Sequence, residues 1–239
     1  MKSVNHQLIT GIRIDWDKLP EYTYLRRIPA LNKLNYLELT HNVTFLVGEN
    51  GSGKSTLLEA IAVASGFNAE GGTKNYSFSS YATRSSLCDA ITIIRGYRKP
   101  KWGYFLRAES FYNVATQEGE YSRTHNYQYH ERSHGESFLA VLQHNISSDG
   151  IYFFDEPEAA LSPQRQLTLL MEIYESAKSG AQFIIATHSP ILLGLPGAQI
   201  LSFDNGNIHP CSYEETECYR VTEMFINNKD YLLKKLLDE

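Results

Sequence analysis

A glycine-rich stretch near residue 50 carries the residue types best suited to binding phosphate. Its sequence, Gly48-Glu49-Asn50-Gly51-Ser52-Gly53-Lys54-Ser55, fits the spacing G-x-x-x-x-G-K-[ST] at every fixed position. The apolar run Val43–Val47 before it is suited to a buried strand, and apolar residues at helical spacing follow it. Glycines let the backbone wrap closely around an anion, and a helix start directs its amides and dipole at phosphates. The stretch through Thr56 is therefore expected to bind ATP, with Lys54 on the β- and γ-phosphates and the Ser55 hydroxyl on Mg²⁺.

Three further motifs follow the glycine-rich stretch along the chain. They read Ser133-His134-Gly135-Glu136-Ser137 at an expected helix start, Asp155-Glu156-Pro157-Glu158 after an apolar strand, and Ala186-Thr187-His188-Ser189-Pro190 after another. Taken alone, an acidic pair at a strand end arises by chance, and a Thr-His-Ser sequence more often caps a turn. Their joint order after the glycine-rich stretch favours one shared site.

Each motif offers groups that phosphoryl chemistry needs. Asp155 ends a buried strand, where it can hold the Mg²⁺ shell together with Ser55. Glu156 can orient and deprotonate the attacking water, and His188 can contact that water and the γ-phosphate. Backbone amides at a helix start can bind further phosphate oxygens. The residues expected at that helix start are Ser133, Gly135 and Glu136.

Composition limits the classes of protein that fit. The chain has 239 residues, 42% of them hydrophobic, which is enough to bury a sizeable core. A net charge of -5 argues against a broadly basic nucleic-acid surface, though not against a local patch. Three cysteines without a C-x-x-C pair fit a reducing cytoplasm, where we expect the protein. No apolar run approaches the ~20 residues that span a bilayer, and the N-terminus lacks a signal-peptide core.

The pattern of apolar runs predicts an α/β fold. We expect a mostly parallel sheet flanked by helices, an antiparallel N-terminal sheet, and a small inserted lobe or lid over residues 67–132, all within one domain spanning residues 1–239. Apolar runs predict strands, and those outside the motifs are near residues 12–16, 34–39, 90–94, 104–106 and 200–203. The C-terminal stretch from Met224 to Leu237 reads as an amphipathic helix. Packing against the domain is its expected role, and a surface for a partner is the alternative.

Two groups of surface residues have a functional and a plain interpretation. The basic stretch 95–103, with Arg95, Arg98, Lys99, Lys101 and Trp102, could stack bases and neutralise phosphates, while a solvated hairpin tip is the favoured alternative. Nucleic acid is therefore a weakly supported partner. The candidates for contacting adenine are Tyr22, Tyr24, Arg26 and Arg27, although ordinary surface positions suit them better.

These motifs together resemble those of the ABC-type ATPase superfamily. GENGSGKS resembles its Walker A, SHGES its signature, IYFFDEPE its Walker B, EAALS its D-loop and THSP its switch histidine. The signature departs from the commonest form because Arg132 replaces a leucine and His134 a glycine. No Q-loop glutamine is evident, and Glu109, or else Gln117, is the best substitute by position. The residues around Walker A and the D-loop are similar to those of compact stand-alone ATPases related to SMC and recombination-repair heads. The sequence shows no heptad pattern for the coiled coil of an SMC protein.

The resemblance implies a function and an assembly. Related ATPases bind and hydrolyse ATP with Mg²⁺, and two heads pair head-to-tail so that each signature faces the other head's γ-phosphate. We accordingly expect an ATP-bound homodimer, acting in nucleic-acid repair or in defence. A transporter's ATPase subunit and a nucleotide-gated switch with negligible turnover are the alternatives. The sequence names no substrate beyond ATP and identifies no protein partner.

Overall fold

The computed structural model describes residues 7–74, 85–107 and 134–237, without the side chains of residues 134–138. Two sheets organise these residues, and the larger has the strand order β10-β9-β3-β8-β7-β6-β4. Its five central strands run parallel, whereas the two-residue strands β4 and β10 pair antiparallel at the edges. From edge to edge the strands are β10 (His209–Pro210), β9 (Gln199–Ser202), β3 (Val43–Val47), β8 (Gln182–Ala186), β7 (Gly150–Asp155), β6 (Trp102–Arg107) and β4 (Gly72–Thr73).

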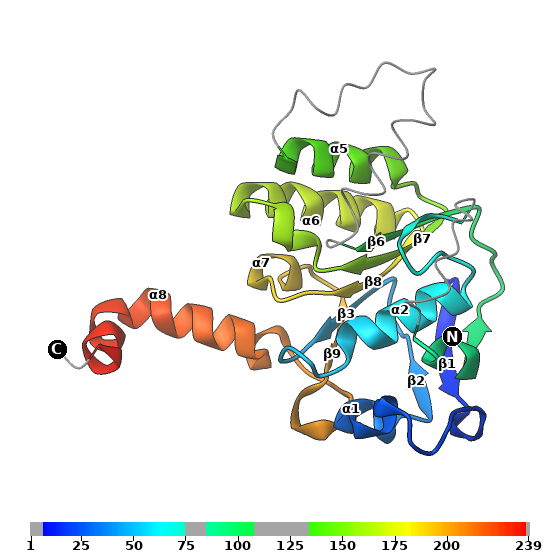
Figure 1. Ribbon diagram of the computed structural model, residues 1–239. Helices are drawn as coiled ribbons and strands as arrows, with labels where there is room; N and C mark the ends of the chain where they lie inside the picture. The colour runs from blue at the N-terminus through cyan, green and yellow to red at the C-terminus, as the bar shows by residue number, and fades with distance from the viewer. Residues whose placement is uncertain (1–6, 75–84, 108–133, 238–239) are drawn as a thin grey trace, which may run out of the picture.

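Helices cover both faces of this sheet, which is why most residues of its central strands are apolar. Figure 1 shows α2 (Lys54–Ala64) on one side, and α5 (His134–Asn145), α6 (Pro163–Lys178) and α7 (Pro190–Leu193) on the other. Neighbouring residues of one strand point to opposite faces. Phe153 of β7 therefore joins the core under α2, while Phe154 joins the core under α6. The predicted α/β class with a mostly parallel, helix-flanked sheet is confirmed.

The smaller sheet is antiparallel, has the order β2-β1-β5, and consists of β1 (Ile9–Ile14), β2 (Tyr36–Glu38) and β5 (Ile91–Arg95). The buried side chain of Gln182 on β8 joins it to the larger sheet. Its Oε1 accepts hydrogen bonds from the backbone N–H of Leu8 (2.9 Å) and Ile9 (2.8 Å), and its Nε2 donates to the carbonyl of Ile9 (2.8 Å). A buried amide with these bonds fixes the relative position of the two sheets.

The expected inserted lobe, residues 67–132, is described only in part. Within it, β5 lies in the antiparallel sheet, the short helix α3 (Leu87–Ala90) packs against α2, and β4 and β6 lie in the larger sheet. Residues 75–84 and 108–133 are outside the described ranges, and the division into one domain stays a prediction. No helix in the described part of the chain is both long and apolar enough to cross a membrane.

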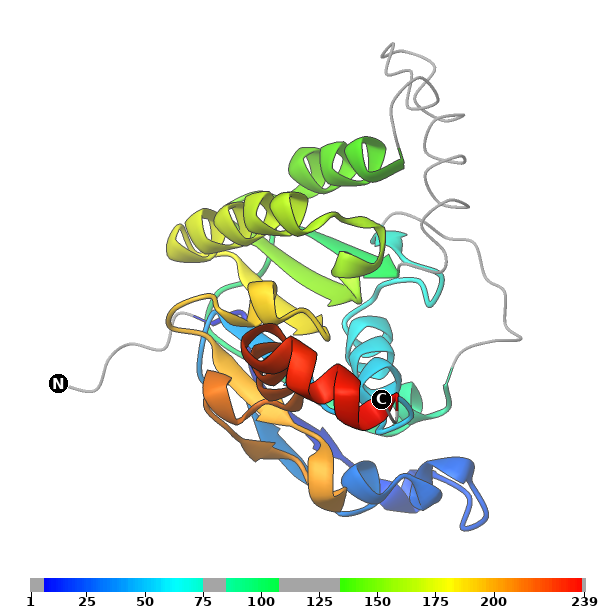
Figure 2. The same ribbon diagram turned by 90° about the vertical axis from the view of Figure 1, so that its left-hand side faces the viewer.

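The C-terminal helix contradicts the expected packing. Helix α8 (Glu217–Leu236) extends away from the body of the molecule in Figure 1, and in Figure 2 it points toward the viewer. None of its residues is buried, and every side chain from Val221 to Asp230 is exposed. The amphipathic pattern correctly predicts a helix, but the prediction that this helix packs on its own domain is wrong.

Candidate active site

The parallel sheet brings the separate motifs to one edge. Leu46 near the end of β3 and Asp155 at the end of β7 both pair with Ala186, the last residue of β8. Val47 pairs with Ser202 at the end of β9. Because these strands are parallel, the loops that follow them emerge at the same, carboxyl, edge, where α/β proteins bind their ligands.

The glycine-rich loop has the backbone that only glycine tolerates at two tight positions. Gly48 has φ +138°, and a Cβ there would lie 2.9 Å from Asp204 Oδ1. Gly53 has φ +102° and forms the N-cap of α2, where a Cβ would lie 2.9 Å from Ile28 Cγ2. Between them Glu49, Asn50 and Gly51 are exposed. The loop thus presents its backbone to solvent directly before a helix N-terminus, as anion binding requires.

Lys54 lies folded over this loop. Its Nζ donates to the carbonyls of Gly48 (2.7 Å) and Glu49 (2.9 Å). Burial lowers the pKa of Lys54, and the carboxylates of Glu156 and Asp155 oppose this shift. A buried ammonium with two carbonyl partners inside an exposed loop is in place to bind an anion that enters the loop.

Ser55 and Asp155 meet at the start of α2. The Ser55 hydroxyl donates to Asp155 Oδ1 at 2.8 Å. Mg²⁺ prefers oxygen ligands at about 2.0–2.1 Å in octahedral geometry, so adjacent ligand oxygens lie about 2.9 Å apart. The observed spacing therefore suits two neighbouring ligands of one Mg²⁺, and these residues fit the ion that the sequence implies.

Glu156 follows with an unusual backbone. Its φ of 48° and ψ of 54° are left-handed, a conformation that costs a non-glycine residue energy and that often marks functional sites. Its N–H donates to the carbonyl of Ala186 at 2.9 Å, which ties the residue to the end of β8. The turn places the carboxylate next to Asp155, close enough to Lys54 to oppose the lowering of that lysine's pKa.

His188 lies in the loop after β8. Its ring Nε2 is buried without a hydrogen-bond partner among the described residues. Burial is the largest cause that lowers the pKa of His188, and the positive charge of Lys54 lowers it further. The carboxylate of Glu156 acts in the opposite direction and raises it. The imidazole is thus neutral at pH 7, and its unpartnered nitrogen can serve a ligand at this edge.

Three residues of the site carried no role in the sequence interpretation. Glu158 Oε1 accepts the backbone N–H of His188 at 2.6 Å, and burial raises the pKa of Glu158. Gln166 Oε1 accepts from the Ser189 hydroxyl at 2.6 Å. Asp204 Oδ1 accepts the backbone N–H of Glu49 at 3.2 Å. Glu158 belongs to one of the quoted motifs, whereas Asp204 lies outside all of them, and no local pattern shows which loop Asp204 would contact.

Several predicted residues are not brought to the site or lie outside the described ranges. Ser133, Glu109 and Gln117 are outside those ranges, and Gly135 and Glu136 are placed only by their backbone, in the first turn of α5. Of the adenine candidates, Arg26 donates to the carbonyl of Trp16 (2.9 Å) and Tyr24 to Ser85 (3.4 Å). Both side chains therefore bond other residues of this chain, and neither bond directs them toward the glycine loop.

An open cavity of about 600 Å³ borders the outer side of the glycine loop. Its walls come from the loop itself, from the start of α1 (Pro29–Asn32), from the turn after β9, and from the segment leading into α8. Asp204, Glu215 and Arg220 contribute charge to it. The start of α8 therefore lies beside the glycine loop.

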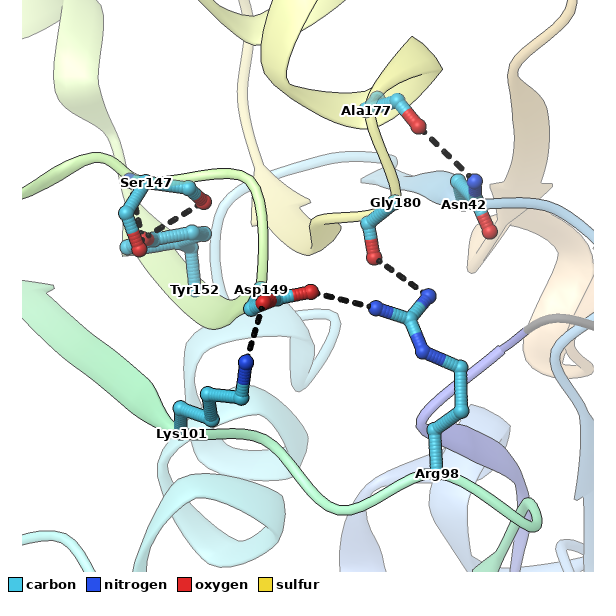
Figure 3. A network of polar contacts seen from close by, with 8 residues as sticks. All are labelled: Asn42, Arg98, Lys101, Ser147, Asp149, Tyr152, Ala177 and Gly180. Carbon is cyan, nitrogen blue, oxygen red and sulfur yellow. Dashed lines mark hydrogen bonds and ion pairs between the residues drawn. The ribbon is translucent and has the colours of Figure 1, made fainter.

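The basic stretch 95–103 is largely used by the fold. Figure 3 shows Arg98 and Lys101 both directed at Asp149, with ion pairs of 2.7 and 2.9 Å. Arg98 also donates to the carbonyl of Gly180 (3.3 Å), and the Trp102 indole donates to the carbonyl of Asn145 (2.8 Å). These contacts hold the turns at the amino ends of β6, β7 and β8, opposite the glycine loop. They favour a structural role for this stretch over nucleic-acid binding. The expected hairpin tip is wrong, because β5 and β6 lie in different sheets and the stretch connects them.

A family model matches the part of the chain that carries the motifs, and solved structures similar to the chain are known. The family model described as "AAA domain, putative AbiEii toxin, Type IV TA system" matches residues 43–137 and 137–194. The solved SMC head domain from Thermotoga maritima is 14% identical, with a TM-score of 0.45 over 86% of this chain and 99% of that chain. An inward-facing structure of a putative metal-chelate type ABC transporter is 20% identical, with a TM-score of 0.41 over 76% of each chain. No curated protein matches the chain.

Proposed function

Because the chain belongs to the AAA-domain family whose model covers residues 43–194, we propose that it is an ATPase that binds and hydrolyses Mg-ATP. The observation that carries the proposal is the contact of Ser55 Oγ with Asp155 Oδ1 at 2.8 Å, directly below the glycine loop. It joins two motifs one hundred residues apart in the geometry that a Mg²⁺ ion bound to nucleotide phosphates requires.

Residues at the carboxyl edge of the parallel sheet have separate roles in phosphoryl transfer. The glycine-loop amides and Lys54 bind the phosphates, and Lys54 exchanges its carbonyl partners for phosphate oxygens. Bound at Ser55 and Asp155, Mg²⁺ would neutralise charge that develops on the β- and γ-oxygens. Glu156 orients the attacking water and accepts its proton, and the neutral His188 contacts the γ-phosphate through its unpartnered ring nitrogen. Glu158 holds the loop that carries His188.

Two copies complete the site in this proposal. By analogy with the ABC-type heads that its motifs resemble, Ser133, Gly135 and Glu136 of one copy would face the γ-phosphate of the other. The position of Gly135 and Glu136 in the first turn of α5 supports this, because amides of a first turn are free to bind an anion. ATP then tightens the association of two chains, and hydrolysis loosens it.

The test is phosphate release measured with and without Mg²⁺ in the wild type, in Glu156→Gln and in a matched control. Glu175→Gln is suitable as the control because it makes the same change on the exposed side of α6. The expected result is Mg-dependent turnover in the wild type and control, and loss of turnover with retained ATP binding in Glu156→Gln. Turnover equal to the wild type in Glu156→Gln would remove Glu156 from the mechanism.

The biological role is a separate question. The description of the family, a putative toxin of a type IV toxin–antitoxin system, favours a defence role over nucleic-acid repair. A transporter subunit would copurify with a membrane protein, and a nucleotide-gated switch would bind ATP without releasing phosphate. A pull-down with the ATP-trapped Glu156→Gln protein separates these outcomes. The cytoplasmic location stays a prediction.

A further inference from the structure

Gln166, near the start of α6, bonds two loops of the candidate site at once. Its Oε1 accepts a hydrogen bond from the Ser189 hydroxyl at 2.6 Å, and its Nε2 donates to the carbonyl of Leu161 at 3.0 Å. Ser189 directly follows His188 in the loop after β8, and Leu161 lies in the segment after β7 that begins with Glu156. The two ends of one side-chain amide thus hold one loop each.

Ser189 passes on the position that Gln166 gives it. Its hydroxyl also accepts the backbone N–H of Leu192 at 3.2 Å, and its own N–H donates to Thr187 Oγ1 at 3.0 Å. Thr187 and Ser189 are both buried, and helix α7, which follows Ser189, lies beside α6 in Figure 1. Because His188 lies between these two fixed residues, the place of its ring depends on theirs.

The hydrogen bonds form a closed network around the two loops. The N–H of Leu161 donates to the carbonyl of Glu158 at 2.9 Å, and Glu158 Oε1 accepts the N–H of His188 at 2.6 Å. A loop held at two points, one on each side of a residue, keeps its orientation, whereas a loop held at one point can pivot. The Gln166 network consists of Glu158, Leu161, Gln166, His188 and Ser189.

The network is anchored on a packed helix rather than on a loop. Helix α6 is 16 residues long, and its Leu169, Ile173 and Ala177 are buried in the core on its side of the sheet. The backbone N–H of Gln166 donates to the carbonyl of Ser162 at 2.9 Å, so the residue belongs to the regular part of the helix. Side chains that project from such elements hold functional groups more precisely than loop residues do.

We propose that Gln166 is a positioning residue for ATP hydrolysis, which holds the His188 loop against the segment that follows Glu156. The inference rests on the proposed function, in which His188 contacts the γ-phosphate while Glu156 orients the attacking water. Gln166 acts through the loops that carry these two groups and not on the nucleotide.

Steady-state phosphate release is the first test. Gln166→Met keeps most of the side-chain volume but neither hydrogen bond, and it should lower kcat about 10–100-fold, the effect of a small misplacement of a catalytic group. The KM for ATP should stay within about threefold, because the glycine loop is untouched. Gln164→Met is the matched control, since it makes the same change at an exposed position of the same helix and should keep the wild-type rate. Equal kcat in Gln166→Met and the wild type would overturn the proposal.

A double-mutant cycle with His188 separates positioning from a general loss of structure. In a His188→Ala background there is no imidazole to position, so Gln166→Met should lower kcat by less than about twofold further. A substitution that merely loosens the fold would lower kcat by the same factor in both backgrounds. That result would contradict the assigned role.

Hydrogen exchange followed by NMR tests the network in the nucleotide-free protein. The N–H groups of His188 and Leu192 should exchange at least about fivefold faster in Gln166→Met than in the wild type, because the loop then opens more often. The N–H groups within α2 should exchange at unchanged rates, and Gln164→Met should resemble the wild type throughout. Unchanged exchange at His188 and Leu192 would show that Gln166 does not hold this loop.

The two kinds of measurement distinguish failure of this inference from failure of the proposed function. A wild type that releases no phosphate would defeat the proposed hydrolysis, and with it the catalytic purpose of Gln166, even where exchange shows that the network holds the loop. Normal Mg-dependent phosphate release in Gln166→Met, together with unchanged exchange, would defeat the positioning role alone and leave the ATPase standing.

Discussion

Glu158 accepts a hydrogen bond from the backbone N–H of His188, with its Oε1 2.6 Å from the nitrogen. This contact ties the short helix after β7, Pro157–Ala160, to the loop after β8. The two loops carry the expected water-orienting residue and the expected γ-phosphate contact. Together with the bond from the Glu156 N–H to the carbonyl of Ala186, this partly covered carboxylate helps to fix their relative position, and burial raises its pKa.

Removal of this carboxylate should slow chemistry more than binding. Glu158→Ala frees the loop of His188, and a small misplacement of a catalytic group costs about 10–100-fold in kcat. The KM for ATP should change by less than about threefold, because the glycine loop is untouched. Glu158→Gln keeps the acceptor oxygen and should restore most of the rate. Equal rates in the wild type and Glu158→Ala, measured by phosphate release, would assign Glu158 no part in positioning His188.

Lys54→Ala should weaken Mg-ATP binding. The substitution removes the ammonium that now bonds Gly48 and Glu49 and that is placed to bind phosphate. A charge-assisted bond of this kind is worth about 1.5–3 kcal/mol, which is roughly 10–150-fold in affinity. Calorimetric titration measures the change, and Lys18→Ala, an exposed lysine beside Asp15, is the control. Unchanged affinity in Lys54→Ala would place the nucleotide elsewhere.

Glu156→Gln should separate binding from hydrolysis. Glutamine keeps the size and hydrogen bonding of the side chain but accepts no proton, and loss of a general base costs ~10²–10⁴ in rate. Trapped ATP should then tighten self-association at least about tenfold relative to ADP, as sedimentation would show. Adding Ser133→Arg should remove this ATP effect, because bulk and charge would block the helix start. A Glu156→Gln protein whose association ignores ATP would argue for a head that works alone.

His188 should titrate below its ordinary pKa of 6.5 because burial and Lys54 both disfavour the imidazolium. An NMR titration of the ring measures this, and Lys54→Ala should raise the midpoint while burial keeps it below 6.5. The effect on stability has a defined sign. Below pH 6.5 the His188 ring is protonated in the unfolded chain but stays neutral in the folded chain. The free energy of unfolding therefore decreases as the pH is lowered from 6.5 to the folded pKa.

His188→Gln removes this linkage. The free energy of unfolding should therefore depend less steeply on pH over that window in the variant than in the wild type. Chemical denaturation at several pH values measures the slopes. A ring that titrates at or above 6.5 would show that the imidazole is not held neutral by its surroundings.

Local sequence determined the parts of this protein that short-range physics controls. The strand Val43–Val47, the glycine loop and the start of α2 were predicted from spacing alone, because close approach to phosphate leaves few residue types possible. The apolar runs that form β7 and β8 were also evident, since a strand covered on both faces must be apolar throughout. The amphipathic pattern of α8 was equally clear as a pattern.

Only the tertiary structure decided which of these parts touch. The bond between Ser55 and Asp155, and the bond between Glu158 and His188, depend on strand order and register. Asp204 reached the glycine loop because β9 lies next to β3, a pairing that no local pattern encodes. The exposure of α8 could not be predicted either, since an apolar stripe has the same periodicity whether its own domain or a second molecule covers it.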